Sequence, residues 1–309
     1  MLVKLRMPAP RRILVLVNPA AGRGGARRLV PAIASLFHKH SLAAEFVEPQ
    51  DAADLARRAA AGAALHNTIL VMGGDGTFQL VVRATLGTGT LLGILPVGGG
   101  NDVAVALGIP KDPIAAAAAF LSGAPRTMDV LRARCSDGRS AVYLGGGGIG
   151  LDAAAARLAS GRFSRWPGAA RYVASALWAF KGFVAPCVEV ELDGARILVG
   201  EPLLLAVVTN TPAYGAGLRI APEANINDGL LDITLVGDLN LLRVLEAFPV
   251  LLRTGDLRWP EVKRFRGRRV ALRTELPSPF HGDGEILGET PVEIDVLEGA
   301  IQVIAPQHV

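Results

Sequence analysis

Three glycine-rich turns with polar neighbours carry the strongest chemical signal in this sequence. They read NPAAGRGG at 18–25, GGDGT at 73–77 and VGGGND at 97–102. Glycine lets a backbone approach a phosphate closely, and the amides at the start of a helix favour an anion. A single turn of this kind usually reflects tight strand-to-helix packing. Three of them, each between a strand-like run and a helix-like run, predict a phosphate-binding edge.

The middle turn is unusual because it carries an acid, Asp75, where a phosphate-binding loop commonly has a lysine. None of the three turns matches the P-loop pattern or the G-x-G-x-x-G dinucleotide pattern. A carboxylate held among backbone amides can instead bind Mg²⁺ that bridges phosphate oxygens. Asp75 is therefore a candidate metal contact, and Thr77 is a candidate helix cap or phosphate ligand.

The elements around these turns predict an α/β domain over residues 1–126. Apolar strand-like runs, beginning with Ile13–Val17, alternate with amphipathic helix patterns up to about residue 123. The runs are apolar on both faces, which is typical of a parallel sheet covered by helices on both sides. In an open parallel sheet the turns after the strands share one edge, where ligands bind.

From about Thr127 the pattern changes to short β-type runs separated by Gly and Asp-Gly turns. This predicts a mostly antiparallel, sandwich-like domain over residues 127–309, so the fold class is α/β plus β, with a cleft between the domains. Two helical inserts are predicted, at 165–182 and 240–253. The last 15 or so residues are expected to return to the first domain.

Composition limits the partners and the compartment. The net charge of +4 favours anionic partners such as nucleotide phosphates, acidic lipids or nucleic acid, without choosing among them. No nucleic-acid reader motif is present, so no nucleic-acid partner is expected. Two isolated cysteines, Cys135 and Cys187, predict a reducing cytoplasm. Prolines and glycines interrupt the uncharged stretches, so no membrane-spanning helix is predicted.

The order of several motifs resembles the bacterial diacylglycerol-kinase-like lipid kinases. This family includes sphingosine and ceramide kinases and shares its fold with NAD kinases. The motifs are NPAAGRG, GGDGT, P-x-G-x-G-N-D at 96–102, P-x-x-x-x-x-D-G-L-L-D at 222–232 and DGE at 283–285. The resemblance covers essentially the whole chain. It implies an ATP- and Mg-dependent kinase for diacylglycerol or a related lipid, cytoplasmic and peripheral to the inner membrane surface.

The resemblance also implies a role for each matching residue. Glu285 would be the general base, and Asp75 and Asp102 would lie at the transferred phosphate, together with Asp129 in the same acidic network. Gly99 replaces the threonine that is usual in the family, which removes one hydroxyl contact to ATP. The residues implied to hold ATP are Asn18, Pro19, Ala20, Ala21, Gly22, Gly73, Gly74, Asp75, Gly76, Thr77, Phe78, Gly98, Gly99, Gly100 and Asn101.

A second metal site is indicated at 225–232. The run contains Asn225, Asn227, Asp228 and Asp232, an oxygen-rich set that suits a hard cation better than a plain Asp-Gly turn does. The resemblance implies that Asp228 and the carbonyls of Asn225 and Leu230 hold a structural Mg²⁺. For Asp283–Glu285 the alternative is a solvated turn. His281, two residues before that turn, is interpreted as a bystander rather than a catalyst.

Two segments are candidates for lipid contact. The helix at 165–182 has Trp178 with basic residues at its ends, so it either meets a bilayer or packs on the sandwich. The run 262–273 has six Lys/Arg residues and either attracts anionic headgroups or forms a solvated edge strand.

Other functions stay open on the sequence alone. An NAD kinase-like enzyme for a soluble metabolite is one alternative. A nucleotide-binding regulatory protein without turnover is another, motivated by Gly99. The sequence does not identify the acceptor lipid, the nucleotide preference or the oligomeric state, and a homodimer is compatible with it.

Overall fold

The computed structural model describes residues 13–163, 166 and 168–307, and the chain divides into two compact units. The N-terminal unit comprises the residues up to Val97, then 109–126, then those from Ile301 onward. The C-terminal unit comprises 98–108 and 127–300. The chain therefore passes between the units four times. None of the helices in the described residues is long and apolar enough to cross a membrane.

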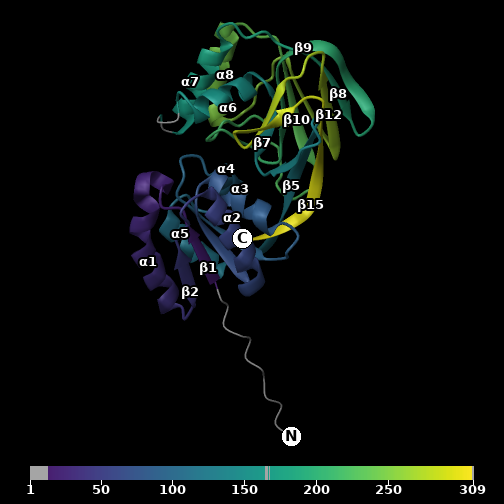
Figure 1. Cartoon of the computed structure of the whole chain (residues 1–309). Coiled ribbons are helices and arrows are strands. Elements are labelled where there is room, and N and C mark those ends of the chain that lie inside the picture. The colour runs from purple at the N-terminus through teal and green to yellow at the C-terminus, as the bar shows by residue number, and fades with distance from the viewer. Residues whose placement is uncertain (1–12, 164–165, 167, 308–309) are drawn as a thin grey trace. The chain divides into compact units, whose positions relative to one another are not determined.

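The N-terminal unit is built on a parallel sheet (Figure 1). Its strands are β1 (Ile13–Val17), β2 (Ala44–Val47), β3 (Thr68–Gly73) and β4 (Leu91–Pro96). They pair in the order β4-β3-β1-β2, and the end of β15 (Val292–Ala305) adds beside β4 through Gln302 and Val303. Every residue of β1 and β3 is buried, as expected for strands apolar on both faces.

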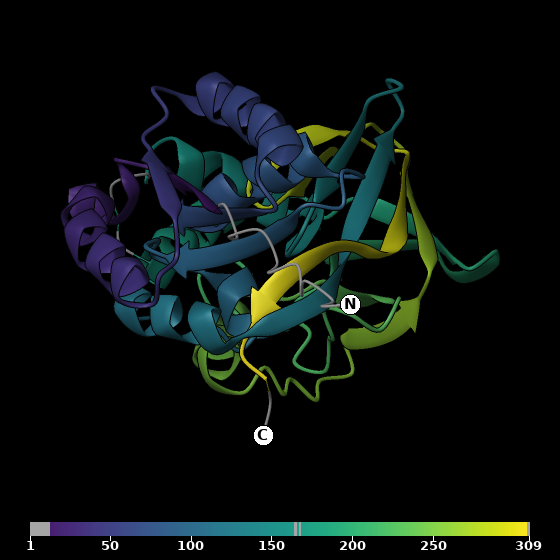
Figure 2. The ribbon, with the colours of Figure 1, turned by 90° about the horizontal axis from the view of Figure 1, so that it is seen from below.

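Helices follow these strands in turn. They are η1 (Ala21–Gly24), α1 (Gly25–Lys39), α2 (Ala52–Leu65), α3 (Asp75–Thr85) and α5 (Pro113–Ser122). Helix α1 contacts α5, and α2 contacts α3. Figure 2 shows the purple and blue helices of this unit around its central strands. The alternation β1-α1-β2-α2-β3-α3-β4 gives the α/β half of the predicted fold class.

The C-terminal unit is mostly antiparallel. One sheet has the order β14-β13-β7-β9-β10-β11, and the other continues from β9 through β8, β12, β15 and β5 to β6. Strand β9 belongs to both, because residues 195–202 pair with β8 and residues 205–209 pair with β7. The bounds are β5 Ala124–Cys135, β6 Ser140–Tyr143, β7 Gly146–Gly150, β8 Cys187–Leu192, β9 Ala195–Thr209, β10 Leu231–Gly237, β11 Val262–Gly267, β12 Arg269–Thr274, β13 Pro279–Gly282 and β14 Glu285–Glu289.

A shared apolar core holds the two sheets together. Side chains from both of them, among them Tyr143, Val190, Val208, Ile233 and Phe280, are fully buried and form one cluster. The parallel sheet of one unit and the antiparallel sheets of the other confirm the predicted fold class, α/β plus β.

Four helices complete the C-terminal unit. They are α4 (Asp102–Ala106), α6 (Leu151–Ser160), α7 (Gly168–Phe180) and α8 (Leu241–Arg253). Helices α7 and α8 correspond to the predicted inserts, and the start of the predicted insert at 165 and 167 lies outside the described residues. Helix α6 is not predicted, because it follows a run of glycines that resembles a turn.

Candidate functional site

The turns after β1 and β3 are tied together at one edge of the N-terminal sheet. Strands β1 and β3 are adjacent and parallel, so their carboxyl ends lie side by side. The Asn18 side-chain Nδ2 donates to Thr77 Oγ1 at 2.8 Å, and its Oδ1 accepts from the Ala20 amide at 3.0 Å. Asn18 thereby fixes the shape of its own turn and joins it to the start of α3.

The glycines of these turns are needed for close packing. Gly22 has φ +58, and a Cβ there would lie 2.8 Å from Val97 Cγ1 at the end of β4. A Cβ at Gly73 would lie 2.7 Å from Thr77 Oγ1. The first turn therefore packs against Val97, and the Asn18–Thr77 hydrogen bond joins it to the second turn. Whether ATP binds there stays a prediction.

Asp75 is the first residue of α3, directly after Gly74, which has no side chain to cap the helix. The amides of Thr77 and Phe78 both donate to the Gly74 carbonyl, at 3.0 and 3.1 Å. A carboxylate in the first turn is favoured by the positive end of the helix dipole. A phosphate would be favoured at the same place for the same reason. The Asp75 carboxylate and the phosphate would then repel each other, and a cation between them would offset that repulsion.

The third turn, 98–101, belongs to the C-terminal unit. Asn101 has φ +61, accepts from the Gly98 amide at 3.0 Å and donates to the Gly98 carbonyl at 2.9 Å. The next residue, Asp102, starts α4 and accepts from the Ala216 amide at 2.9 Å. Asn101 thus closes the turn on itself, and Asp102 connects it to residues 214–218.

Asp129 is buried at 1% exposure and bonds to one loop and to strand β15 of the C-terminal unit. Its two oxygens accept from the amides of Gly229 and Gly299, each at 2.7 Å. The backbone carbonyl of Asp129 accepts from the Asn210 side chain at 2.9 Å. The structure thus joins Asp129 to the loop that carries Asp228. Its membership of the acidic network around the phosphate stays a prediction.

Glu285 is the first residue of β14 and follows a tightly held turn. Asp283 and Gly284 have φ values of +50 and +85, as in a two-residue hairpin turn between β13 and β14. The Asp283 carboxylate accepts from the amides of Leu144 and Gly145 at 2.7 and 2.8 Å. The turn is therefore fixed to the chain just before β7, and it presents Glu285 at an exposed position.

A glycine strand lies beneath this turn. A Cβ at Gly147 would lie 2.3 Å from the His281 carbonyl oxygen, and one at Gly148 would lie 2.6 Å from Asp152 Oδ2. The sequence pattern predicts a turn at this glycine run. The available signal was four consecutive glycines, 145–148, next to β-type runs, because glycine within a strand marks a close backbone approach.

His281, Asp152 and Tyr214 form a buried polar cluster beside β7. His281 Nε2 lies 3.0 Å from Asp152 Oδ2, and the Tyr214 hydroxyl lies 3.5 Å from the same oxygen. The Tyr214 and His281 rings stack with centroids 6.2 Å apart. Burial, and then Asp152, raise the pKa of Tyr214 well above its usual value, so its hydroxyl stays protonated and can donate. No sequence signal linked these residues.

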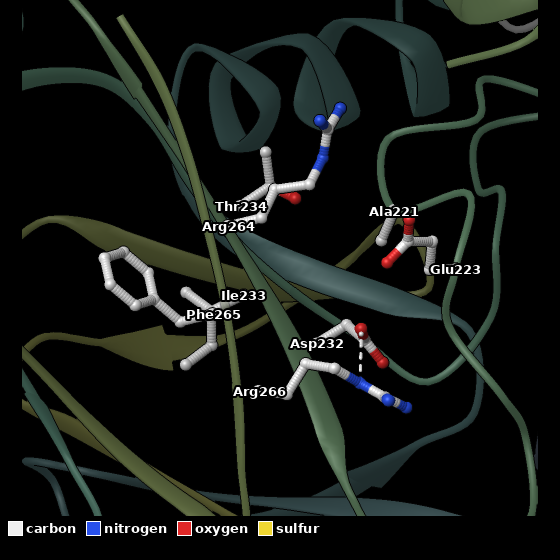
Figure 3. Close-up of a pocket in the computed structure, with 8 residues that line it drawn as sticks. All are labelled: Ala221, Glu223, Asp232, Ile233, Thr234, Arg264, Phe265 and Arg266. Atoms are coloured by element: carbon white, nitrogen blue, oxygen red, sulfur yellow. Dashed lines mark ion pairs between the residues drawn. The ribbon is translucent and has the colours of Figure 1, made fainter. Parts of the chain in front are cut away.

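The predicted metal loop folds on itself. Asp228 Oδ1 accepts from the Leu230 amide at 3.1 Å, and the Asn225 side chain accepts from the Asn227 amide at 3.4 Å. The Arg266 guanidinium pairs with Asp228 Oδ2 and, at 3.1 Å, with Asp232 Oδ1. Figure 3 shows Arg266 beside Asp232 in a pocket of about 190 Å³ that Glu223 also lines.

Arg264 and Arg266 line this pocket together with the acids, and Asp232 keeps one unsatisfied oxygen there. Burial raises the pKa of Asp232 to about 6, even though Arg266 acts in the opposite direction. Its second oxygen, Oδ2, is buried and has no hydrogen-bond partner. An unpaired buried carboxylate oxygen is costly, and a hard cation would satisfy it. Within the described residues no cluster of three or more His, Cys, Asp or Glu side chains could hold a metal, so backbone carbonyls would have to complete the ligand set.

The basic run 262–273 is largely neutralised by acids. Arg268 pairs with Glu298 at 3.0 Å, and Arg273 pairs with Glu191 at 3.1 Å. Lys263 pairs with Glu201 at 3.3 Å, and Arg269 pairs with Glu293. The strands β11 and β12 carry this run, and their charges lie mostly in ion pairs. Of the two readings of this run, the structure favours a solvated, charge-paired surface over a headgroup-binding patch.

Two family models match successive parts of the chain. The model described as the diacylglycerol kinase catalytic domain matches residues 12–133. The model described as the YegS C-terminal NAD kinase beta sandwich-like domain matches residues 146–305. The two matches together span most of the chain, and the second alone covers more than half of it.

Relatives and solved structures agree with these matches over nearly the full length. A diacylglycerol kinase of Mycobacterium tuberculosis is 33% identical, covering 99% of this chain and 98% of its own length. A diacylglycerol kinase of Bacillus subtilis is 28% identical, with 96% and 97% covered. A crystal structure of a diacylglycerol kinase from Bacillus anthracis superposes with a TM-score of 0.73 at 22% identity, covering 97% of this chain and 98% of that one. The last likeness concerns the fold alone.

Proposed function

The chain belongs to the diacylglycerol kinase family of lipid kinases, and we propose that it transfers the γ-phosphoryl group of ATP to a hydroxyl of diacylglycerol or a closely related lipid. The acceptor resides in a membrane, so the enzyme works at a membrane surface. The proposal rests on the family and on the two groups of residues described above. Each group lies within one unit of the chain.

The edge of the N-terminal sheet supplies the nucleotide end of the proposal. Gly22 and Gly73 let the backbone of these turns pack closely at the ends of the strands, where phosphates would lie. The Asn18–Thr77 hydrogen bond holds two of these turns in register. Glycine-lined backbone at a helix start is the arrangement that binds phosphates in open α/β sheets. Asp75, at the same place, would contact the Mg²⁺ that accompanies ATP.

The hairpin turn of the C-terminal unit supplies the acceptor end. The observation that carries the proposal is that Asp283 is anchored by three backbone amides, so that Glu285 is presented by a rigid turn. A general base must be held at a defined position relative to the hydroxyl whose proton it takes. Asp102 and Asp129, which bond to backbone amides of the same unit, would hold the surrounding loops rather than accept the proton.

The chemistry follows from these roles. Glu285 would accept the proton of the lipid hydroxyl while that oxygen forms a bond to the γ-phosphorus and the bond to the ADP oxygen breaks. When bound, Mg²⁺ would neutralise charge on the phosphates. Backbone amides of the glycine turns would hold the phosphates. The products are ADP, a lipid phosphate and a proton on Glu285, which water then removes.

A transfer assay tests the proposal. The full-length protein is incubated with γ-labelled ATP, Mg²⁺ and diacylglycerol in mixed micelles, and labelled phosphatidic acid is measured. Parallel reactions contain EDTA in place of Mg²⁺, sphingosine in place of diacylglycerol, or NAD as the acceptor. We expect label in a lipid only when Mg²⁺ is present, and loss of that label in Asp75→Asn. Label in NADP alone, or equal transfer with EDTA, would refute the proposal.

A further inference from the structure

Helix α8 has an apolar outer face. The helix begins after Asn240, whose side chain accepts from the Arg243 amide at 3.0 Å. Its inner face packs into the C-terminal unit through Val244, Ala247 and Leu251, all of which are buried. Four leucines of the same helix are instead exposed: Leu241 by 47%, Leu242 by 64%, Leu245 by 45% and Leu252 by 45%.

The exposed leucines form one continuous stripe. At about 100° per residue, the four leucines and Pro249 fall in a sector roughly 100° wide, next to the sector of the buried residues. A surface helix of a globular protein normally places charged residues there. The only acid in this helix is Glu246, which lies at the edge of the stripe. The helix therefore has two apolar sides. The C-terminal unit covers one of them, and the leucine stripe is exposed on the other.

One cation, Arg253, borders this stripe in the last turn of the helix, and it is exposed. Arg243 lies roughly 100° away from the stripe around the helix axis, and its guanidinium lies 4.8 Å from the centroid of the Trp259 ring. Neither arginine forms an ion pair with any residue in the part of the chain that the structure describes. This distinguishes them from the arginines of β11 and β12, which are mostly paired with acids. An unpaired arginine beside an apolar stripe, as Arg253 is here, complements anionic headgroups above acyl chains.

A second exposed apolar residue lies on an element that shares the same core. Phe183, just after α7, packs in the cluster that contains Val244 of α8 and Leu239. The next residue, Val184, is 84% exposed. Figure 1 shows α7 and α8 at the same end of the C-terminal unit. The C-terminal unit therefore exposes a further apolar side chain next to a residue that packs in the same core as α8.

We propose that the outer face of α8 docks the protein onto a lipid bilayer that contains anionic headgroups. This deepens the proposed function, on which it rests for the location of the acceptor in a membrane. A helix with an apolar stripe and an arginine at its border lies in the headgroup plane with its leucines in the acyl boundary. A second copy of the chain fits this face of α8 less well than a bilayer does. The four leucines together expose about as much as two whole leucine side chains, far less than the roughly 800 Å² per partner of a stable interface.

Vesicle binding tests this docking surface without any reaction. The full-length protein, without ATP or diacylglycerol, is sedimented with vesicles of phosphatidylcholine alone or mixed with phosphatidylglycerol. The test variant is Leu242→Gln/Leu245→Gln. The matched control is Val199→Gln/Leu276→Gln, which changes two residues of the same unit that are 64% and 78% exposed. We expect wild type and control to bind the anionic vesicles, and the test variant to bind about tenfold more weakly.

A second readout separates docking from catalysis. Phosphorylation of a water-soluble short-chain diacylglycerol is compared with that of a long-chain diacylglycerol in vesicles. The α8 variant should lose activity on vesicles and keep it on the soluble acceptor. Vesicle binding through α8 without phosphorylation of any acceptor would refute the proposed function and leave the docking surface in place. Unchanged vesicle binding by the α8 variant would overturn the docking proposal, as would a shift from dimer to monomer in that variant without a change in vesicle binding.

Discussion

His281 Nε2 lies 3.0 Å from Asp152 Oδ2 in the interior of the C-terminal unit, two residues before the turn that presents Glu285. His281 is 2% exposed and Asp152 is 9% exposed. The pair connects β13 to the first turn of α6, and Tyr214 stacks on the imidazole ring. A buried polar pair of this kind fixes the relative positions of the segments that carry it.

Removal of one partner should leave the other buried and unsatisfied. We predict that His281→Ala lowers the free energy of unfolding by about 2–4 kcal/mol, because Asp152 loses its partner. His38→Ala, at an exposed position near the end of α1, should change stability by less than about 0.5 kcal/mol. Chemical denaturation of the three proteins checks this. Equal stability of His281→Ala and wild type would show that the pair contributes nothing.

The Gly148 position tests the packing of the glycine strand. A Cβ there would lie 2.5 Å from the Ala206 carbonyl oxygen and 2.6 Å from Asp152 Oδ2. Because backbone on one side cannot move aside, we predict that Gly148→Ala costs about 2–3 kcal/mol of stability. Gly161→Ala is the control, since its Cβ would meet its nearest atom at 3.4 Å. A thermal-unfolding midpoint for Gly148→Ala equal to that of the control would contradict the prediction.

Part of this architecture is predictable because its signals are local. Alternating strands and helices, with glycines after each strand, predict a parallel sheet whose turns share one edge. The Asn18–Thr77 bond and the packing of Gly22 on Val97 agree with that arrangement. The sandwich is predictable as a class from its short strands. Its strand order is not, since β9 and β15 each take part in two sets of pairings.

Long-range partners explain what sequence reasoning missed. His281 is 129 residues away from Asp152, so nothing near either residue marks them as a pair. The glycines at 145–148 have the composition of a turn, and only the strands beside them show that they are in close contact. Helix α6 follows them directly and was missed with them. The α8 leucines repeat like a core stripe, and exposure alone reveals that four of the five face outward.

Asp232 should make stability depend on pH. Its carboxyl has a pKa of about 6 in the folded protein against 3.8 ordinarily, so the folded state binds more protons between these values. The free energy of unfolding therefore falls as the pH rises from about 4 to 6, and the whole of this decrease is present above pH 6 or so. We predict that Asp232→Asn, relative to wild type, gains stability on the order of 2–3 kcal/mol between pH 4 and pH 8.

The control for this pH dependence is Asp256→Asn. Arg258 lowers the pKa of Asp256 below its usual value, chiefly through a side-chain hydrogen bond, so that carboxyl is ionised throughout the window. Thermal unfolding of the three proteins at pH 4.5 and pH 8 makes the comparison. A pH-independent difference between Asp232→Asn and wild type would show that the Asp232 carboxyl titrates normally.

Added Mg²⁺ should stabilise the loop at 225–232. If Asp228 and the Asn225 and Leu230 carbonyls hold the ion, Mg²⁺ without nucleotide raises the unfolding midpoint of wild type in a concentration-dependent manner. Asp228→Asn should remove that increment, whereas Asp238→Asn, at an exposed position after β10, should retain it. Differential scanning calorimetry with Mg²⁺ or EDTA provides the measurement. An equal increment in both variants would place the ion elsewhere.

The most direct test of the kinase mechanism is the turnover number of Glu285→Gln, which keeps the size of the side chain and removes the base. Glu289→Gln, at the other end of β14 and also exposed, is the matched control. We predict that Glu285→Gln lowers kcat for lipid phosphorylation by about 10²–10⁴-fold with little change in the KM for ATP, while the control keeps the wild-type rate. A Glu285→Gln enzyme that turns over as fast as wild type would contradict the account.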